Sequence, residues 1–373
     1  MKKFNLIATT TFGIEAITKK EIEKLGYKGL KVENGKVELE GSVADIAKLN
    51  IWLRTAERVL IKMAEFKATS FEELFDQTEA IDWAALIPID GKMHVVGKSV
   101  KSQLYSVPDC QSIVKKAIIK SMSNSYGIDN FEEDGPVYKI EVAILKDVVT
   151  LSIDTSGAGL HKRGYRAYAG AAPLKETLAA ALVMMSRWKF SQPMIDPFCG
   201  SGTILIEAAM FARNMAPGLN RSFVCEEWPG FEASLFSKAR DDASSKTFKD
   251  KTYKLIGYDI DEQVLRQARS NAKAAGVGAD IEFHQRDFAD FSSSIGAACL
   301  VTNPPYGERL SDEEQVRKLN EMLGDLRDEH PHWGINVFTA FGGFERDFGE
   351  EASKNRKLYN GRILTRFYNY YPI

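Results

Sequence analysis

The sequence lacks several features that would assign a protein to a class at once. Its 373 residues contain no uncharged run of the roughly 18 residues that a membrane span needs. The four cysteines form no CxxC pair, and the five histidines form no HExxH motif and no cluster with cysteine. This argues against a disulfide framework and against a bound metal. The N-terminal segment is interrupted by Glu15 and carries no small-residue cleavage site, so it does not fit a signal peptide. We therefore expect a soluble, cytoplasmic protein without a metal.

A net charge of one sign is also missing. The chain has 49 basic and 51 acidic residues, so bulk charge does not indicate a polyanionic partner. The basic residues are nevertheless unevenly distributed: residues 92–120 contain six lysines and one acid, and residues 157–175 contain four basic residues and no acid. Such patches can attract phosphate on a neutral protein, although lysine-rich faces are more often simply solvated. Charge alone leaves nucleic-acid binding open.

The N-terminal half reads as two α+β units, within a chain long enough for two or three domains. Residues 1–66 predict the order strand, helix, strand, strand, helix, strand, with a hairpin turn at Asn34-Gly35, which is a ferredoxin-like arrangement. Residues 67–156 predict a second unit with helices over 71–81 and 110–122, a strand over 92–99 and a hairpin over 138–154. The Gly- and Ala-rich residues 157–172 predict a linker.

Residues 173–373 change to strands that alternate with helices. This pattern predicts an α/β fold with a mostly parallel, Rossmann-like sheet. The final residues, 356–370, predict an antiparallel hairpin turned at Asn360-Gly361. Residues 214–253 do not fit the alternation and indicate an insertion.

A glycine-rich loop, Asp196–Thr203, follows the first strand of this region and precedes a helix. Its glycines let a ligand approach the backbone, and the helix N-terminus offers unpaired N–H groups. The third glycine of a dinucleotide fingerprint is replaced by Leu205, and no phosphate-loop lysine follows. Asp259 ends the next strand, where it can accept hydrogen bonds from a ribose, and Asp287 follows the third strand. Three strand ends with suitable residues indicate a nucleoside-containing ligand more strongly than one turn does.

The fourth strand ends in Asn303-Pro304-Pro305-Tyr306. A planar exocyclic amine is a poor nucleophile because its lone pair is delocalised. The Asn303 side-chain oxygen and the Pro304 carbonyl can accept its two N–H hydrogens and direct the lone pair toward an electrophile. The paired prolines restrict the backbone that presents these acceptors, and Tyr306 offers a face for stacking a flipped base. This sequence therefore favours chemistry on an amino nitrogen.

The segments DPFCGSGT, GYDID and TNPPYGERL resemble the motifs of class I S-adenosylmethionine (SAM)-dependent methyltransferases that act on amino nitrogens. The segments HKRGYR and APLKETLAA resemble the region before the catalytic domain in methyltransferases that carry a THUMP domain, an RNA-binding module. With MAPGLNRSF and EEW, the chain resembles the bacterial 23S ribosomal RNA guanine-N2 methyltransferases of the RlmL/YpsC type. The resemblance implies that residues 67–156 are the THUMP domain and residues 173–373 the methyltransferase domain.

The resemblance also implies roles for individual residues. Asp196, Gly200 and Gly202 would bind the methionine part of SAM, with Leu174 and Thr177 lining that end. Asp259 would hold the ribose, Ile260 would pack on the adenine, and Asp287 would contact the adenine amine. The remaining expected cofactor residues are Pro197, Phe198, Ser201, Thr203 and Asn303. The expected catalytic residues are Asn303, Pro304, Pro305 and Tyr306, and the expected RNA-binding residues are Lys98, Lys101, Lys115, Lys116, Lys120, Arg163, Tyr165, Arg166, Lys357 and Arg362.

Several alternatives remain open from the residues. NPPY suits adenine N6 in DNA as well as guanine N2, and a protein glutamine amide offers the same acceptor geometry. An inactive RNA-binding protein with a methyltransferase fold is a further alternative, and a nicotinamide dehydrogenase fits least because of Leu205. Long members of the resembled family carry a second methyltransferase domain that this chain lacks, so we expect one methylation rather than two.

Overall fold

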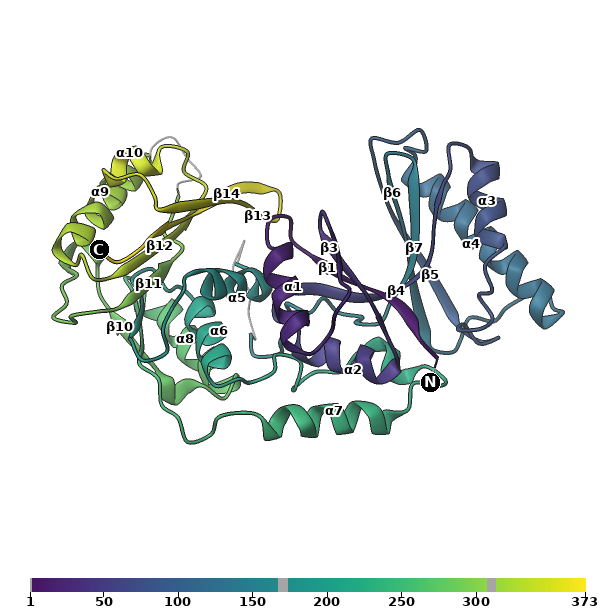
Figure 1. Cartoon of the computed structure of the whole chain (residues 1–373), viewed down its shortest axis with the longest axis horizontal. Helices are drawn as coiled ribbons and strands as arrows, with labels where there is room; N and C mark the ends of the chain where they lie inside the picture. Colours follow the sequence, from purple (N-terminus) through teal and green to yellow (C-terminus); the bar gives the residue numbers. More distant parts are fainter. Residues whose placement is uncertain (1, 167–173, 307–312) are drawn as a thin grey trace.

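The computed structural model describes residues 2–166, 174–306 and 313–373. In these residues two seven-stranded sheets form the two halves of the molecule, with helices packed against both (Figure 1). No helix in these ranges is long and apolar enough to cross a membrane.

The N-terminal sheet has the strand order β2-β3-β1-β4-β7-β6-β5. Its first elements are β1 (Phe4–Thr10), α1 (Glu15–Lys24), β2 (Lys31–Glu33), β3 (Lys36–Gly41), α2 (Val43–Trp52) and β4 (Ala56–Lys67). The second group comprises α3 (Phe71–Glu79), β5 (Lys92–Val100), α4 (Val107–Tyr126), β6 (Val137–Leu145) and β7 (Val148–Asp154). Local signals explain the ends of these elements: Ser42 and Asp45 form a capping box at α2, and Gly127 ends α4 in the left-handed conformation.

One long strand joins the two predicted N-terminal units. β4 has 12 residues, and it pairs antiparallel with β1 along its first half and with β7 further along. The boundary expected after residue 66 therefore falls inside β4, and the two units share a single sheet. Sequence periodicity missed this because it identifies strands without identifying their neighbours.

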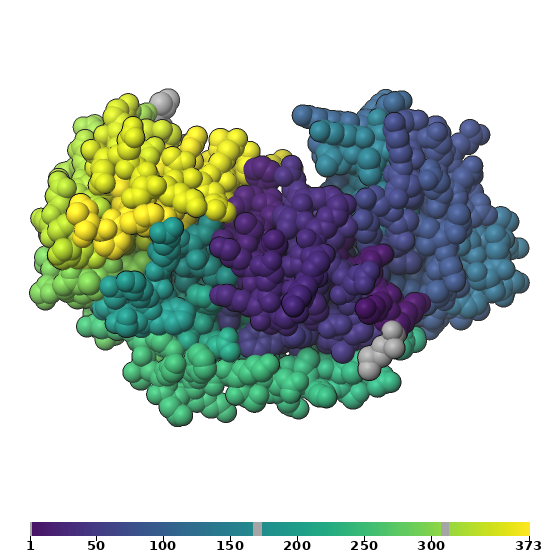
Figure 2. Space-filling model, in the orientation of Figure 1, coloured from purple at the N-terminus to yellow at the C-terminus, as the bar shows by residue number. Residues whose placement is uncertain are grey.

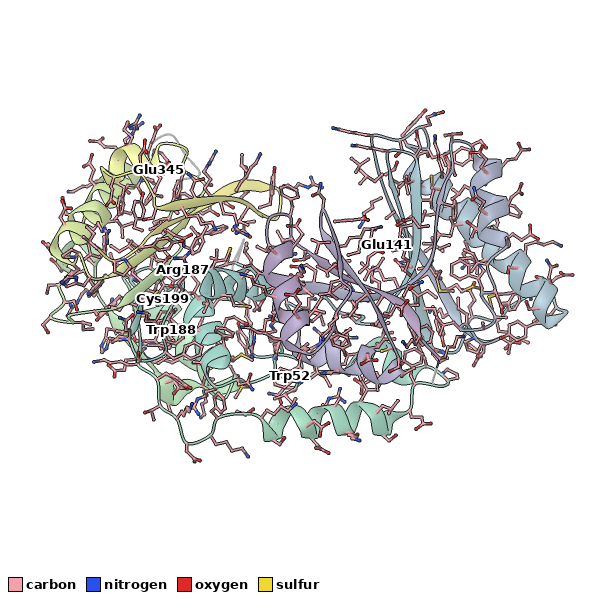
Figure 3. All side chains as sticks on the ribbon, viewed as in Figure 1. Trp52, Glu141, Arg187, Trp188, Cys199 and Glu345 are labelled. Atoms are coloured by element: carbon pink, nitrogen blue, oxygen red, sulfur yellow. The ribbon has the colours of Figure 1, made fainter. Side chains whose placement is uncertain are left out.

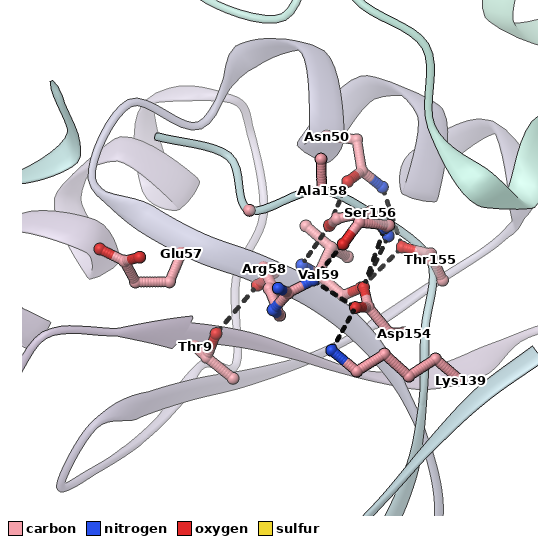
Figure 4. A network of polar contacts seen from close by, with 12 residues as sticks. Thr9, Asn50, Glu57, Arg58, Val59, Lys139, Asp154, Thr155, Ser156 and Ala158 are labelled. Carbon is pink, nitrogen blue, oxygen red and sulfur yellow. Dashed lines mark hydrogen bonds and ion pairs between the residues drawn. The ribbon is translucent and has the colours of Figure 1, made fainter. Parts of the chain in front are cut away.

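The chain leaving β7 is fixed by a buried polar network just before the expected linker (Figure 4). Asp154 forms an ion pair with Arg58 and accepts the Ser156 N–H at 2.9 Å. Ser156 in turn accepts the Val59 N–H at 2.8 Å and donates to Asn50 Oδ1 at 2.6 Å. Residues 157–166, the described part of the expected linker, continue along the protein with three buried side chains: Leu160, Arg163 and Tyr165.

The C-terminal half, which the resemblance predicts to be the catalytic half, has the strand order β10-β9-β8-β11-β12-β14-β13. Its elements are α5 (Glu176–Met185), β8 (Met194–Asp196), α6 (Thr203–Ala212), α7 (Ala233–Ser245), β9 (Leu255–Asp259), α8 (Glu262–Ala274), β10 (Ile281–Gln285), β11 (Cys299–Thr302), α9 (Glu313–Glu329), β12 (Gly334–Thr339), α10 (Phe344–Phe348), β13 (Lys354–Asn360) and β14 (Ile363–Tyr370). The first five strands of this order are parallel, and β14 and β13 are antiparallel. This confirms the Rossmann-like sheet with a terminal hairpin.

The insertion at 214–253 fastens the two halves together. Its helix α7 runs beneath α2 of the N-terminal half (Figure 1). Trp228, just before α7, is buried in the core of the N-terminal sheet, where its ring stacks on Tyr138 with centroids 4.5 Å apart. Its indole N–H donates to the Val137 carbonyl at 3.0 Å. The surface has a hollow at the top of the space-filling view (Figure 2). The tip of the C-terminal hairpin and the ferredoxin-like unit lie on one side of this hollow, and the β5–β7 region lies on the other.

Candidate active site

The carboxyl ends of β8, β9 and β11 meet at one edge of the catalytic sheet, as expected for neighbouring parallel strands. The glycine-rich loop after β8 turns there through two left-handed glycines, Gly200 (φ +52°) and Gly202 (φ +81°). A Cβ atom on Gly202 would lie 3.0 Å from the Phe283 ring and 3.2 Å from Ala268. Only glycine fits both the backbone angle and this close approach. The loop therefore presents its backbone rather than side chains.

Asp196 is buried at the end of β8, where only 1% of its surface is exposed. Its carboxylate accepts the Thr302 hydroxyl at 2.6 Å and the Phe198 N–H at 3.2 Å. Burial raises the pKa of Asp196 to about 7, although these two hydrogen bonds act to lower it. A buried carboxylate held this way suits recognition of a cationic group, because a positive charge would offset the desolvation.

Asp259 closes the glycine-rich loop. Its carboxylate accepts the Gly200 N–H at 2.9 Å and the Asp261 N–H at 3.0 Å, so both oxygens face this edge of the sheet. The neighbouring Ile260 side chain is 64% exposed, which leaves an apolar surface free to pack on a flat ring. Asp287 is exposed and accepts one N–H, from Ala289, at 2.9 Å. The expected ribose and adenine residues thus lie in sequence order around one edge.

Asn303 follows β11 directly, beside this edge. Its Oδ1 atom is buried and has no hydrogen-bond partner among the residues that the structure describes. A buried acceptor without a partner costs free energy unless a ligand supplies a donor. Pro304 is buried, Pro305 is exposed and Tyr306 is half-buried, so the turn is anchored on one side and accessible on the other. This geometry suits an amine that approaches Asn303.

The cysteines near the site do not offer a nucleophile. Cys199 is buried within the glycine-rich loop (Figure 3), and burial raises the pKa of its thiol well above the ordinary range. Cys299 is buried inside β11, and burial raises the pKa of its thiol to about 12. Thiolates are the reactive form, so both cysteines are packing residues.

Arg166 joins the starts of the two helices beside the site. It donates to the Thr203 hydroxyl and to the Leu174 carbonyl, the latter at 3.2 Å. It also pairs with Glu176 at 3.6 Å. Arg166, which was expected to bind RNA, therefore lies at the glycine-rich loop. Glu176 is the first residue of α5, and no sequence motif indicated it as the partner of Arg166.

The start of α5 is also bound to the N-terminal half through Glu57 on β4. Thr177 donates to Glu57 at 2.6 Å and Lys175 pairs with it at 3.1 Å. Although burial acts to raise it, hydrogen bonds from His161, Thr177 and Lys175 lower the pKa of Glu57 to about 2. The Thr177 hydroxyl is thus already used, so its contribution to the methionine end is to place α5. Sequence reasoning missed Glu57 because this partner lies about 120 residues away.

Two of the expected RNA-binding residues lie in the interior, which corrects that expectation. Arg163 is 3% exposed and Tyr165 is 5% exposed. Both contact the buried Glu207 of α6, the Tyr165 hydroxyl at 3.1 Å and the Arg163 guanidinium at 3.4 Å. Buried charges require partners, and this group satisfies Glu207 internally. Their role is to fix residues 157–166 against the catalytic half.

The other expected RNA-binding residues differ in their surroundings. Lys115 pairs with Glu133 at 2.7 Å and donates to the Met93 carbonyl at 3.2 Å, so it serves the fold. Lys98 pairs with Glu141 at 2.8 Å but is still largely exposed. The remaining five are exposed: Lys101, Lys116, Lys120, Lys357 and Arg362. The described residues contain no group of three or more side chains that could hold a metal ion.

The fold and this edge of the sheet define a SAM-dependent methyltransferase. The residues fit the cofactor: the loop offers open backbone, Asp259 offers carboxylate oxygens, and Ile260 offers an exposed apolar surface. The model of the RMKL-like methyltransferase domain matches residues 163–369, and the RlmL ferredoxin-like and THUMP domains match residues 5–60 and 68–154. This chain belongs to the RMKL-like methyltransferase family and uses SAM.

Three relatives show how closely the whole chain follows this family. "Putative RNA methyltransferase YpsC" of Bacillus subtilis (strain 168) is 47% identical over 373 residues, covering 100% of this chain and 97% of that protein. A Listeria monocytogenes structure described as a "predicted N6-adenine-specific DNA methylase" has a TM-score of 0.94 and 49% identity, covering 100% and 97%. "SMU.472, a putative methyltransferase complexed with SAH" has a TM-score of 0.94 and 41% identity, covering 100% and 99%.

Proposed function

We propose that this protein transfers one methyl group from SAM to the exocyclic N2 of a guanine in RNA, with 23S ribosomal RNA as the substrate and the cytoplasm as its location. The observation that carries the proposal is the buried Asn303 Oδ1 atom, which has no partner among the described residues and lies beside the cofactor loop. An acceptor in this position needs a donor, and an exocyclic amine supplies one.

The chain's own residues position the amine. Asn303 Oδ1 and the Pro304 carbonyl accept the two N–H hydrogens, which localises the nitrogen lone pair, and Tyr306 stacks on the base. The Thr302 hydroxyl donates to the Asp196 carboxylate at 2.6 Å, directly before this turn. The end of β11 therefore positions both Asp196, which is expected to bind SAM, and Asn303, which accepts the amine. Bound SAM supplies the electrophilic methyl group. Catalysis then consists mainly of alignment of the amine.

RNA is favoured as the substrate by the N-terminal half. The matched THUMP domain occupies residues 68–154 and shares a sheet with the ferredoxin-like unit. Exposed lysines on it, Lys98, Lys101, Lys116 and Lys120, can contact phosphate. The relative named as an RNA methyltransferase covers the same full length.

Adenine N6 in DNA is the second candidate, because the Asn303-Pro304 geometry serves that amine equally well. The Listeria structure is described as a methylase of that kind. The choice between the two rests on substrate rather than on the amine acceptor.

The test is methyl transfer from SAM labelled in its methyl group. Ribosomal RNA that lacks the modification and duplex DNA are offered in parallel, and the products are digested to nucleosides and identified. The Asn303→Ala protein serves as the control for site-specific transfer. N2-methylguanosine from RNA alone supports the proposal. N6-methyladenine from DNA would overturn the RNA assignment while retaining the amine chemistry.

A further inference from the structure

The C-terminal hairpin carries charge of one sign. Residues 352–373 contain five basic residues, Lys354, Arg356, Lys357, Arg362 and Arg366, and no acidic residue. Its two strands have one face against the core, through Leu358, Thr365 and Phe367. The opposite face carries Lys357 and Tyr359 on β13 and Leu364 and Arg366 on β14, because side chains alternate along each strand. We refer to these four residues as the hairpin strip.

Two like charges lie directly opposite each other in the hairpin strip. Lys357 pairs in register with Arg366, and both side chains are exposed. Like charges at directly opposed positions destabilise a sheet. Among the described residues, neither side chain has a carboxylate within salt-bridge distance. The Arg366 guanidinium donates to the amide oxygen of Asn355 at 3.3 Å, and the Lys357 ammonium lies over the Tyr359 ring, 5.8 Å from its centroid. An anion that bridges the two cations would relieve their mutual repulsion.

The next register pair of the strip is apolar. Tyr359 lies opposite Leu364, which is 48% exposed. Phe12 of the N-terminal half is 47% exposed and packs edge-on against Tyr359, with ring centroids 6.1 Å apart. The contact is fixed nearby, where Arg356 donates to the Gly13 carbonyl at 2.9 Å. Tyr359 itself is half-buried, so part of its ring is open to solvent beside the paired cations. Accessible aromatic rings beside cations are the combination that binds single-stranded nucleic acid, through base stacking and phosphate contact.

The hairpin strip lies close to the amine acceptor. Thr302 is level with Val337 on β12, and Thr339 is level with Arg366 on β14. Asn303 is therefore level with Phe367, the neighbour of Arg366, and two strand spacings, roughly 10 Å, separate these backbone positions at the same carboxyl edge. Because side chains alternate, the hairpin strip lies on the face opposite Phe367 and reaches the acceptor around this edge. The hairpin extends from there toward α1 and the hollow in the surface (Figures 1 and 2).

We propose that the hairpin strip binds the single-stranded RNA that flanks the target guanine, with Lys357 and Arg366 bridged by one backbone phosphate and a neighbouring base stacked on Tyr359. This inference rests on the proposed function and assigns a surface outside the THUMP domain to substrate binding. Non-ionic partners are disfavoured because they would leave the two opposed cations unbridged.

The test compares Lys357→Glu with Lys249→Glu, which makes the same charge change at an exposed residue that follows α7. Binding of a fluorescently labelled single-stranded RNA is measured by anisotropy over a range of salt concentrations, with thermal unfolding and SAM binding measured on the same samples. We expect Lys357→Glu to weaken RNA binding at least about tenfold and to lower the salt slope by about 0.7 for the lost phosphate contact. Its melting temperature should equal or exceed that of the wild type, because an opposed pair of unlike charges replaces a repulsive one.

A second pair of variants tests the stacking. Tyr359→Phe keeps a ring and should bind RNA within about twofold of the wild type, whereas Tyr359→Ala should lose about tenfold. If Lys357→Glu and Lys249→Glu bind RNA equally well, and the wild type binds and methylates RNA, the proposal that the hairpin strip binds RNA is overturned and the proposed function is left intact. A wild type that binds and methylates duplex DNA but not RNA would overturn both.

Discussion

Asp196 provides a prediction with a calculable magnitude. Burial raises its pKa to about 7 from the ordinary value of 3.8, which corresponds to about 4 kcal/mol at 1.36 kcal/mol per pKa unit. The folded protein holds the Asp196 proton up to a higher pH than the unfolded chain does. The contribution of this proton to the free energy of unfolding is therefore complete below pH 3.8 and is lost as the pH rises to about 7. Above that pH the ionised carboxylate destabilises the cofactor-free protein.

The perturbation is Asp196→Asn. An asparagine Oδ1 can still accept the Thr302 hydroxyl and the Phe198 N–H, but it carries no charge. We expect the variant to match the wild type near pH 4 and to be more stable by up to about 4 kcal/mol at pH 8. Urea unfolding of both proteins without cofactor, at intervals from pH 5 to 8.5, measures the difference.

A second variant checks the cause of the shift. Thr302→Val removes the hydrogen bond that lowers the Asp196 pKa, so the pH at which stability is lost should move above about 7. SAM carries positive charge, so its affinity for the wild type should rise as the pH increases through about 7, while Asp196→Asn should bind SAM as the wild type does at low pH and more weakly than the wild type above about pH 7. A constant difference in stability between wild type and Asp196→Asn across this range would refute the reasoning.

Three further outcomes follow from packing and positioning. Gly202→Ala should lower stability by about 1–3 kcal/mol in thermal unfolding, because of its φ of +81° and the 3.0 Å approach of a Cβ to Phe283. Trp228→Ala should lower the free energy of unfolding by about 3–5 kcal/mol, since the ring is 2% exposed and packs the insertion against the N-terminal sheet. A melting temperature equal to that of the wild type would contradict this. Arg166→Lys should weaken SAM affinity about tenfold in calorimetry without unfolding the protein, because one ammonium cannot hold both Thr203 and the α5 start.

Local sequence signals predicted most elements of the fold. The helical spacing of residues 15–24, the Asn34-Gly35 and Asn360-Gly361 turns and the strand–helix alternation after residue 173 each depend on neighbours in the chain. The joining of the two N-terminal units through β4 depends on which strands pair, and periodicity carries no information on pairing. The packing of α7 on α2 also joins segments nearly 200 residues apart.

In the candidate site, too, the features set by chain order were predicted and those set by contacts between distant segments were not. Asp196 and Asp259 end strands of one parallel sheet, and Gly202 and Asn303 come after such strands, so chain order alone brings them to one edge. Basic residues were predicted less well, because composition does not distinguish a solvated charge from a buried one. Arg163 lies inside the protein, where it pairs with Glu207 from a separate part of the sequence.

The most direct test of the central claim is a single-turnover measurement of methyl transfer by Asn303→Ala beside the wild type, with SAM affinity determined on the same samples. Because the Asn303 oxygen is assigned to the amine and not to folding, we expect the variant to bind SAM within a few fold of the wild type and to transfer methyl at least about a hundredfold more slowly. Transfer at the wild-type rate, with SAM affinity unchanged, would contradict the account.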